Sequence, residues 1–252
     1  MEKKLITLTT DFGDQFAVVQ LHAVTMLLGF WGRVIENHSV TAFSILEGAF
    51  EIDVLADFSP HDTIHVGVVD PGVGSRRRGI VIRTKKSWYV GPDNGLLYPA
   101  AVDESIQQVW ELNESKIGGT ISHTFHGRDV FIKAAVYLAK GKKPEDFGSR
   151  KIDPAQLIKL KIKQGQVVHI DNYGNVKVFY KDHLRPGNTL QIKIKGKKFS
   201  VPIVKTFSDV EQGKPLALLG SSGTLELAIN YSRGDTFFGA KLGDVLQIEY
   251  AK

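Results

Sequence analysis

The sequence predicts an α/β protein, in which an N-terminal α/β sandwich-like domain with a mostly parallel sheet precedes a smaller C-terminal β-barrel-like domain. In the first part of the chain, short runs rich in valine and isoleucine alternate with segments of helical length and apolar spacing, as in parallel α/β sheets. Past about residue 160 only short strand-like runs between turn residues follow, which indicates a small barrel or sandwich. We therefore expect domains at residues 1–160 and 161–252.

The elements of the first domain follow from local patterns. β-Branched apolar runs predict strands, and apolar residues at helical spacing predict amphipathic helices. Strands are expected at residues 5–9, 63–69, 79–83 and 88–90, and helices at residues 16–28, 45–55 and 129–139. Two of these strands end in turn sequences, Asp70-Pro71-Gly72 and Pro92-Asp93-Asn94-Gly95.

The second domain has a different pattern. Strands are expected at residues 166–170, 176–180, 189–195, 199–204, 216–219 and 245–250. Turn groups such as Asn172-Tyr173-Gly174-Asn175 separate them. A lysine-rich link after Pro154 marks the boundary at residues 158–163.

Composition narrows the class of protein. Of the 252 residues, 42% are apolar and 23% are charged, as in ordinary globular proteins. No apolar run approaches the ~20 residues of a membrane span, and the N-terminal residues do not resemble a secretory signal. We expect a cytoplasmic protein without a membrane partner. Because the chain has no cysteine, disulfides, thiolate catalysis and cysteine metal sites are excluded.

The net charge of +5 and the pI near 9.2 raise the question of nucleic-acid binding. Much of the positive excess lies in Lys193-Ile194-Lys195-Gly196-Lys197-Lys198. Lysine alternating with isoleucine is typical of one solvated face of a hairpin, and strand lysines discourage edge-to-edge pairing. We favour this interpretation over an RNA-binding patch and expect no nucleic-acid partner.

Four polar clusters lie where ligands bind in open α/β sheets, beyond strand ends or before a helix. There is no dinucleotide or triphosphate loop and no H-E-x-x-H sequence. The clusters are Thr10-Asp11-Phe12-Gly13, Asp70-Pro71-Gly72-Val73-Gly74, Gly91-Pro92-Asp93-Asn94-Gly95 and Phe125-His126-Gly127-Arg128-Asp129.

Each cluster also has a structural interpretation. Asp11 could cap the helix that starts near Asp14, the sequence after Asp70 could be only a turn, and Asp129 could be an N-cap. His123 and His126 lack the carboxylate spacing of a metal site, so we expect no metal.

Taken together, these clusters resemble the S-adenosyl-L-methionine (SAM) hydroxide adenosyltransferase family, the SAM hydrolases, whose halide-using relatives are the fluorinases and chlorinases. The second domain continues the resemblance with Ile170-Asp171-Asn172-Tyr173-Gly174-Asn175 and Gly220-Ser221-Ser222-Gly223-Thr224-Leu225-Glu226-Leu227-Ala228. The resemblance implies hydrolysis of SAM to adenosine and methionine without a cofactor. It also implies a homotrimer, with the active site between the N-terminal domain of one subunit and the C-terminal domain of the next.

The resemblance implies a water-handling trio of Asp70, Arg77 and His126, although Arg76 and Arg78 leave a one-residue ambiguity. A guanidinium keeps its proton, so Arg77 would favour hydroxide over water rather than act as a base. His126 is the favoured base and Asp70 the anchor of the attacking water.

The same resemblance implies a set of substrate-binding residues. Asp11 would take the ribose hydroxyls and Phe43 would pack on the ribose, while Phe207 would stack on adenine. Since a phenylalanine is more often a core residue, packing is the alternative for both rings. The remaining residues are Asn175 for the adenine edge, Asp171 for the methionine ammonium, Ser221 and Ser222 for the amino-acid end, and Glu226, whose role could be structural.

The chain departs from the family at Val19-Gln20-Leu21-His22, where a Met-Lys pair is usual, and at Ile35-Glu36-Asn37-His38, where Asp-x-Thr-His is usual. Two functional alternatives stay open. The first is a non-catalytic sensor of adenosine or SAM, which would need none of the three water-handling residues. The second is a halogenase, which Asp70 argues against because a carboxylate repels halide.

Overall fold

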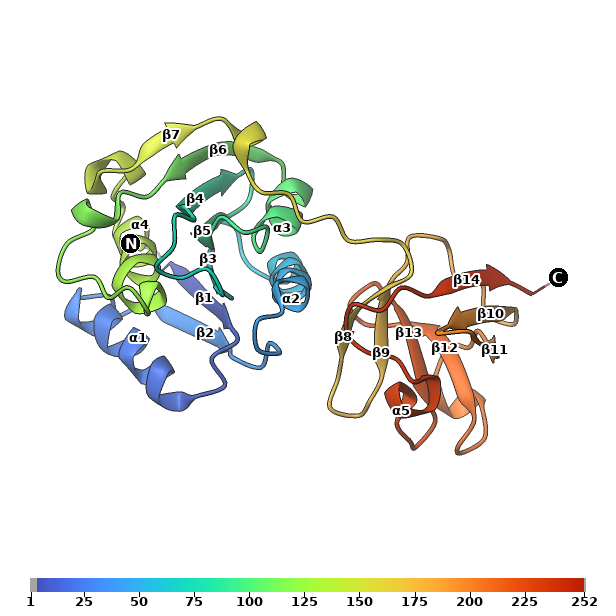
Figure 1. The fold of residues 1–252 in the computed structure, drawn as a ribbon. Helices are drawn as coiled ribbons and strands as arrows, with labels where there is room; N and C mark the ends of the chain where they lie inside the picture. Colours follow the sequence, from blue (N-terminus) through green and yellow to red (C-terminus); the bar gives the residue numbers. More distant parts are fainter. Residues whose placement is uncertain (1–3, 252) are drawn as a thin grey trace. The chain divides into compact units, whose positions relative to one another are not determined.

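The computed structural model describes residues 4–251. These residues form two compact units, and the division falls between Leu160 and Lys161 (Figure 1).

Unit 1 is built on a seven-stranded sheet in the order β2-β1-β3-β5-β4-β6-β7. Strands β2, β1, β3 and β5 pair in parallel, whereas β4 is antiparallel to both β5 and β6, and β7 is antiparallel to β6. The strands are β1 (Leu5–Thr10), β2 (Arg33–Asn37), β3 (Ile64–Val68), β4 (Gly79–Thr84), β5 (Trp88–Pro92), β6 (Ile106–Glu111) and β7 (Arg150–Ile152).

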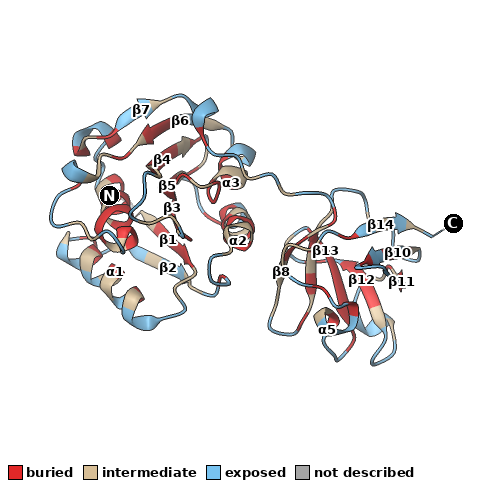
Figure 2. Ribbon diagram, viewed as in Figure 1, coloured by how far each residue is buried: buried red, intermediate tan, exposed pale blue. Residues whose placement is uncertain are grey.

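Helices cover both faces of this sheet (Figure 1). Helices α1 and α4 share one buried apolar cluster with the strands, and α2 and α3 share a second one. Buried residues concentrate in the central strands and on the helix faces turned toward them (Figure 2). The helices are α1 (Gln15–Leu27), α2 (Ile45–Asp57), α3 (Tyr98–Asp103) and α4 (Ile132–Ala139), with a π-helical turn η2 (Gly127–Phe131) and 3-10 turns η1 (Glu114–Lys116), η3 (Pro144–Phe147) and η4 (Pro154–Gln156).

The caps explain where two helices begin. The Asp14 side chain accepts the N–H of Phe16 at 2.8 Å, so Asp14 caps α1 and Asp11 does not. Ser44 caps α2 by accepting the N–H of Glu47. Asp11 therefore does not cap α1, and the structural interpretation offered for it from the sequence is wrong.

Unit 2 consists of two small antiparallel sheets around one core. The sheets have the orders β12-β13-β9-β8 and β11-β10-β14. Isolated bridges between Gln166 and Val245 and between Ile203 and Ala217 link the ends of the two sheets, which gives the predicted barrel-like character. The elements are β8 (Gln166–Ile170), β9 (Val176–Phe179), β10 (Thr189–Ile194), β11 (Lys197–Pro202), η5 (Phe207–Asp209), β12 (Pro215–Leu219), β13 (Leu225–Ile229), α5 (Gly234–Phe238) and β14 (Gln247–Tyr250).

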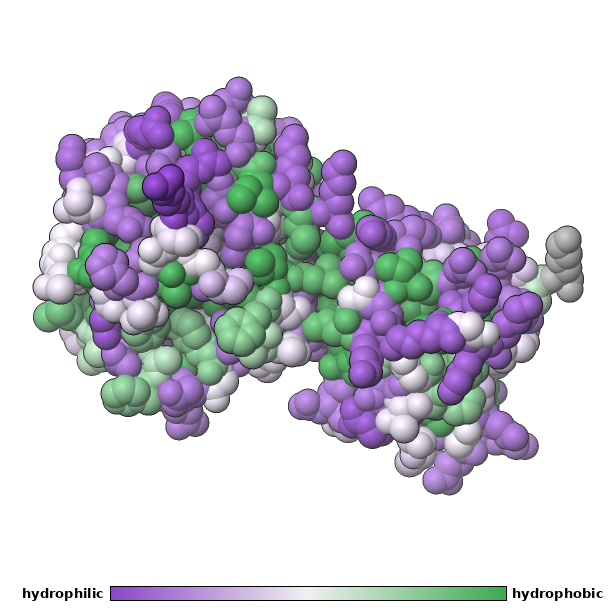
Figure 3. Space-filling model, in the orientation of Figure 1, coloured by the Kyte–Doolittle hydropathy of each residue, from purple (hydrophilic) through white to green (hydrophobic). Residues whose placement is uncertain are grey.

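The lysine-rich run forms the hairpin β10–β11, as predicted. Leu190, Ile192 and Ile194 are buried, while Lys193 and Lys198, which pair across the hairpin, are exposed. The surface over these strands is largely hydrophilic in Figure 3.

Within residues 4–251, no helix combines the length and the apolar character that crossing a membrane would require.

Candidate active site

Asp70, Arg77 and His126 converge at one edge of the unit 1 sheet. Asp70 follows β3, Arg77 precedes β4, and His126 directly precedes the π-helical turn η2. All three side chains are buried, with exposed fractions of 6%, 8% and 4% respectively. Three segments far apart in the sequence therefore contribute to one desolvated polar cluster.

Arg77 is the centre of this cluster. Its Nε donates to both carboxylate oxygens of Asp70 at 3.0 Å, and its Nη2 donates to Asp70 Oδ2 at 2.6 Å. The same Nη2 donates to Nδ1 of His126 at 2.7 Å. The guanidinium also lies over the Phe131 ring, with its Cζ 5.1 Å from the ring centroid, which fixes its plane.

A glycine explains how the Asp70–Arg77 loop approaches His126. Gly74 has a φ of +75°, and a Cβ there would lie 2.4 Å from the carbonyl oxygen of His123. The loop therefore packs backbone against backbone on the segment that leads to His126. On the other side, the buried Asp129 carboxylate accepts the N–H of Ser122 at 2.9 Å, so the ends of this segment are tied together.

The neighbouring arginines have different surroundings. Arg78 forms an ion pair with Asp93 and donates to the carbonyl of Gln156 at 2.6 Å. Arg76 is exposed. Of the three adjacent arginines, Arg77 is the one whose side chain contacts Asp70 and His126.

The cluster keeps His126 neutral. Burial lowers the pKa of His126, and the positive charge of Arg77 acts in the same direction, whereas Glu114, Asp70 and Asp129 act to raise it. A neutral imidazole has an unprotonated nitrogen, consistent with acceptance of the Arg77 hydrogen bond, and is the form that can take a proton.

A small cavity of about 110 Å³ adjoins this cluster and is lined by Asp11, Phe43, Asp70 and His126, among others. One carboxylate oxygen of Asp11 accepts the backbone N–H of Phe43 at 2.8 Å. Phe43 has a φ of +66°, a conformation that L side chains rarely adopt, and 73% of the residue is exposed. Phe43 is therefore not a core residue, and the alternative that its ring packs in the core is wrong.

Unit 2 carries an open groove of about 1000 Å³. The predicted residues that line it are Asp171, Asn175, Phe207, Ser221 and Glu226. Phe207 is 39% exposed on η5, so it is not a core residue either. Ser222 is not among the residues that line the groove; its hydroxyl lies 3.2 Å from that of Thr224.

Two of the groove carboxylates already have partners within the chain. Asp171 accepts the backbone N–H groups of Tyr173 and Asn175 and the Nδ2 of Asn175 at 2.9–3.0 Å, which shapes the turn between β8 and β9. Glu226 is buried and accepts a hydrogen bond from Lys177 Nζ at 2.7 Å. Glu226 and Lys177 are directly opposite on β13 and β9, so this pair supports the floor of the groove.

Sequence reasoning missed several residues at these sites. Glu114, in η1, has its Oε1 3.4 Å from Arg77 Nη1 and 3.2 Å from His126 Nδ1, but no motif marks it. Lys177 and Tyr231 line the groove, and Tyr231 is 87% exposed. Strand alternation places Lys177 on the face opposite Val176 and Val178, but only the strand pairing reveals its partner.

Both units match models of one family. Residues 6–148 match the SAM hydroxide adenosyltransferase N-terminal domain, and residues 165–247 match the C-terminal domain of the same family. Among solved structures, one described as an uncharacterized conserved protein from Thermotoga maritima is similar with a TM-score of 0.89 and 27% identity, over 97% of this chain and 100% of that chain.

Curated relatives of this chain are enzymes. The chain is 33% identical to a protein named (R)-S-adenosyl-L-methionine hydrolase from Salinispora tropica, over 96% of this chain and 97% of that protein. It is 29% identical to a protein of the same name from Methanocaldococcus jannaschii, over 98% and 96%. A protein named Fluorinase from an Actinoplanes species is more distant, with 25% identity over 77% and 79%. The two family models and these relatives agree with the motifs of both units, and the chain belongs to the SAM hydroxide adenosyltransferase family.

Proposed function

We propose that this protein hydrolyses SAM to adenosine and L-methionine by in-line attack of activated water on the ribose carbon bonded to sulfur. The observation that carries the proposal is the buried cluster of Asp70, Arg77 and His126, in direct contact beside a cavity that Asp11 also lines. The names of the relatives support the same reaction.

The difficult partner in this reaction is the nucleophile. A sulfonium leaves readily: the carbon–sulfur bond breaks, its electron pair stays on sulfur, and neutral methionine departs. Water is a poor nucleophile, so the site must hold it in line and remove a proton as the new carbon–oxygen bond forms. Positioning of the water lowers the entropic part of the barrier.

Arg77 supplies fixed charge rather than proton transfer. A guanidinium has five N–H hydrogens. Asp70 accepts Nε–H and one Nη2 hydrogen, and Glu114 accepts one Nη1 hydrogen. His126 accepts the second Nη2 hydrogen in the tautomer that has its lone pair on Nδ1. One Nη1 hydrogen remains for the attacking water, and the positive charge favours its hydroxide form.

Asp70 holds the attacking water and His126 accepts its proton. Asp70 Oδ1 accepts one hydrogen bond, from Arg77 Nε, and has capacity left to accept one from water. His126 is neutral and accepts the water proton; general-base help of this kind is worth about 10²–10⁴ in rate. The site needs no metal or cofactor in this scheme.

The substrate contacts belong to the same proposal. Asp11 has a second carboxylate oxygen for the two ribose hydroxyls, and Phe43 offers its exposed ring to the sugar. In unit 2, Phe207 offers a stacking surface for adenine and Asn175 a hydrogen-bonding edge. Asp171, Ser221 and Ser222 are assigned to the amino-acid end, and Glu226 to support of the groove through Lys177.

A homotrimer belongs to this proposal as well, with unit 1 of one subunit and unit 2 of the next completing each site, as does a cytoplasmic location. Light scattering of the purified protein measures the assembly. A monomer that hydrolyses SAM at full rate would contradict the trimeric part of the proposal.

The reaction is tested by incubating the protein with SAM in heavy-oxygen water and separating the products by liquid chromatography with mass detection. We expect equimolar adenosine and methionine, with the heavy oxygen in the adenosine hydroxyl at the attacked carbon. Added chloride or fluoride should yield no halogenated nucleoside. Stoichiometric binding of SAM with no adenosine after long incubation would identify a sensor instead.

A further inference from the structure

Two groups compete for one nitrogen of His126. Arg77 Nη2 lies 2.7 Å from Nδ1, and Glu114 Oε1 lies 3.2 Å from the same atom. The arginine can only donate, so its hydrogen bond requires a lone pair on Nδ1. The glutamate can only accept, so its contact requires a proton there. The two contacts therefore belong to two different protonation states of the imidazole.

The base-competent state is the one that Glu114 stabilises. No described residue hydrogen-bonds to Nε2, so Nε2 is the nitrogen available to a water in the adjoining cavity. For Nε2 to carry the lone pair, Nδ1 must carry the proton. Among the described residues, Glu114 is the carboxylate that forms an ion-pair contact with Nδ1, with its Oε1 at 3.2 Å. A second carboxylate behind a catalytic imidazole is a known way to fix its tautomer and to stabilise the imidazolium that forms.

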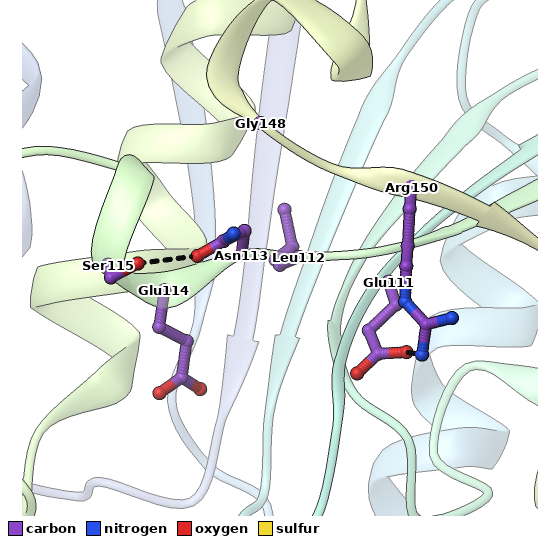
Figure 4. Close-up of a pocket in the computed structure, with 7 residues that line it drawn as sticks. All are labelled: Glu111, Leu112, Asn113, Glu114, Ser115, Gly148 and Arg150. Carbon is purple, nitrogen blue, oxygen red and sulfur yellow. Dashed lines mark hydrogen bonds and ion pairs between the residues drawn. The ribbon is translucent and has the colours of Figure 1, made fainter.

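Glu114 also connects the buried cluster with solvent. Its side chain is 35% exposed, against 8% for Arg77 and 4% for His126. It lines an open hollow of about 490 Å³ together with Glu111, Asn113 and Arg150. Figure 4 shows the Glu114 side chain extending away from the hydrogen bond between Ser115 and Asn113, so its carboxylate is not used to hold its own turn.

The chemistry requires such a connection. Conversion of cationic SAM and water into adenosine and methionine releases one proton in each cycle. That proton first resides on His126, whose side chain is almost completely buried. With substrate in the cavity on one side, the route that remains runs from Nδ1 to the half-exposed carboxylate on the other.

We infer that Glu114 is a positioning residue of the active site, which holds the Nδ1 proton of His126 and passes the proton of the reaction to solvent. In the catalytic step, Nε2 takes the water proton as the carbon–oxygen bond forms and the carbon–sulfur bond breaks. The Nδ1 proton then moves to Glu114 and on to a buffer base, which leaves the neutral Nε2–H tautomer whose Nδ1 accepts the Arg77 hydrogen bond. After the products leave, a water in the cavity takes the Nε2 proton and Glu114 returns a proton from solvent to Nδ1, so that one proton is released in each cycle and the base-competent tautomer is restored. This inference rests on the proposed hydrolysis for its kinetic part.

The charges around His126 agree with this role. The charged groups that face it are Asp70 from the loop after β3, Arg77 from the loop before β4, Glu114 from η1 and Asp129 from η2. Glu114 is the strongest of these influences, and it raises the pKa of His126 against the effect of burial. Removal of its charge should therefore lower that pKa.

The kinetic test compares Glu114→Gln, which keeps shape and removes the proton acceptor, with Glu111→Gln as the matched control. Glu111 lines the same hollow and pairs with Arg150, and among the described residues no hydrogen bond or ion pair joins it to the cluster. We expect Glu114→Gln to lower kcat by about 10-fold or more with KM changed by less than about twofold. Glu114→Asp should restore part of the loss, and Glu111→Gln should match the parent protein.

Two further readouts separate proton transfer from packing. In Glu114→Gln, the acid limb of the kcat/KM profile should move to lower pH, because the pKa of His126 falls. Small diffusible bases such as imidazole should raise kcat of this variant and leave the parent protein unchanged. Equal losses in kcat and in adenosine affinity, or no rescue at any buffer concentration, would overturn the inference.

A measurement independent of turnover distinguishes the two proposals. Nitrogen NMR of histidine-labelled protein, with the His126 signals identified by their loss in His126→Asn, reports the tautomer and the pKa directly. We expect Glu114→Gln to lower the pKa of His126 and to reduce the Nδ1–H form. If the parent protein makes no adenosine but these shifts occur, the hydrolysis proposal fails and the Glu114–His126 coupling stands. If the parent is active and neither shift occurs, the coupling fails alone.

Discussion

Arg77 occupies the centre of the cluster because a guanidinium donates in several fixed directions at once. Its Nε and Nη2 donate hydrogen bonds to the Asp70 carboxylate, and Nη2 also donates to His126 Nδ1. Such charge-assisted, two-pronged contacts are stronger and more directional than a single ammonium contact. The position of Asp70 relative to His126 thus depends on one side chain.

Arg77→Lys should therefore be damaging although it keeps the charge. A lysine offers one nitrogen and cannot hold Asp70 and His126 together, so we expect kcat to fall by about 10²–10³-fold while KM changes little. Arg76→Lys, on an exposed neighbour, is the matched control and should be silent. Steady-state kinetics with SAM decide the matter, and a parallel loss of substrate affinity would mean that Arg77 binds substrate instead.

Asp11→Asn should act on binding rather than on turnover. The asparagine oxygen can still accept the Phe43 N–H, but it lacks the charge that we assign to the ribose hydroxyls. A hydrogen bond to a charged group contributes about 1.5–3 kcal/mol, so adenosine affinity measured by calorimetry should weaken by about 10-fold or more. Unchanged affinity would remove Asp11 from the substrate site.

Asp14→Ala is the control for that variant. Asp14 lies in the same loop but caps α1. Its loss should lower stability by about 1 kcal/mol and leave adenosine affinity intact.

The sequence predicted the residues that belong to contiguous motifs and missed those that do not. Asp70 and His126 lie in recognisable clusters. The spacing from Asp70 favoured Arg77 but left Arg76 and Arg78 open, and the contacts in the structure distinguish the three. Glu114 lies in a short 3-10 turn, and no pattern distinguishes it from other glutamates. Its contact with His126 exists only because β6 delivers the following turn to the same sheet edge, which local sequence does not encode.

At the scale of elements, most strands with strong apolar character were predicted to within about two residues. The exception is β13, which was missed although it is buried along its whole length, and β2, β6 and β7 were missed as well. β3 is buried along its whole length, and its predicted range of 63–69 encloses the observed strand. β2 is an edge strand with mixed exposure, and β7 has three residues. Such strands exist because a neighbour pairs with them, so their own residues carry little periodic signal.

The helix predicted at residues 129–139 begins differently from the prediction. The α-helix α4 starts at Ile132, and the preceding residues form the π-helical turn η2. Propensity and periodicity do not distinguish a π turn from an α turn. This irregular turn places His126 within the cluster and the buried Asp129 near His126, and π turns often occur at functional sites.

Gly74 is the backbone position on which the assembly of the site depends. We expect Gly74→Ala to lower kcat/KM and to destabilise unit 1 by about 1–3 kcal/mol, because the left-handed φ and the 2.4 Å approach to the His123 carbonyl both exclude a side chain. Gly187→Ala is the control, since Gly187 has a φ of +90° with no neighbouring atom within 4 Å. It tests backbone strain alone and should leave catalysis intact. Equal behaviour of the two variants would show that the contact with the His123 segment is unimportant.

At the scale of the whole molecule, each unit has its own core, so stability can be followed unit by unit. The three tryptophans of the chain, Trp31, Trp88 and Trp110, all lie in unit 1. Trp88 and Trp110 stack with their ring centroids 5.8 Å apart, so tryptophan fluorescence reports the unfolding of this unit. The division itself is visible in the sequence as the change from alternating helices and strands to strands alone.

A buried histidine and a partly buried aspartate in unit 1 make its stability depend on pH in opposite ways. Burial, reinforced by the positive charge of Lys86, lowers the pKa of His65 to about 4. Unfolding lets His65 take up a proton at mildly acidic pH, so its contribution favours unfolding as the pH falls from about 6.5 toward 4. Burial, together with Asp103, Asp57 and Glu104, raises the pKa of Asp53 from 3.8 to about 7. Asp53 therefore destabilises the folded state increasingly as the pH rises from about 4 to about 7, and the loss of stability stays at its full value above that.

Asp53→Asn should consequently stabilise unit 1 at alkaline pH and have little effect in acid. The folded parent protein must ionise a carboxyl among three other acidic groups above neutral pH, whereas an asparagine stays neutral at every pH. We expect a gain on the order of 1 kcal/mol or more near pH 8, which raises the Tm followed by tryptophan fluorescence by about 2–4 °C. Near pH 3 the two proteins should melt together, because Asp53 is then protonated in the folded state and, below its ordinary pKa of 3.8, mostly protonated in the unfolded state as well. Asp57 is exposed, and its negative charge contributes to raising the pKa of Asp53. Asp57→Asn should therefore also raise the Tm at alkaline pH, but by less than Asp53→Asn. A gain for Asp53→Asn that is equal at both pH values would instead reflect better packing of α2, and would remove the ionisation of Asp53 as a determinant of stability.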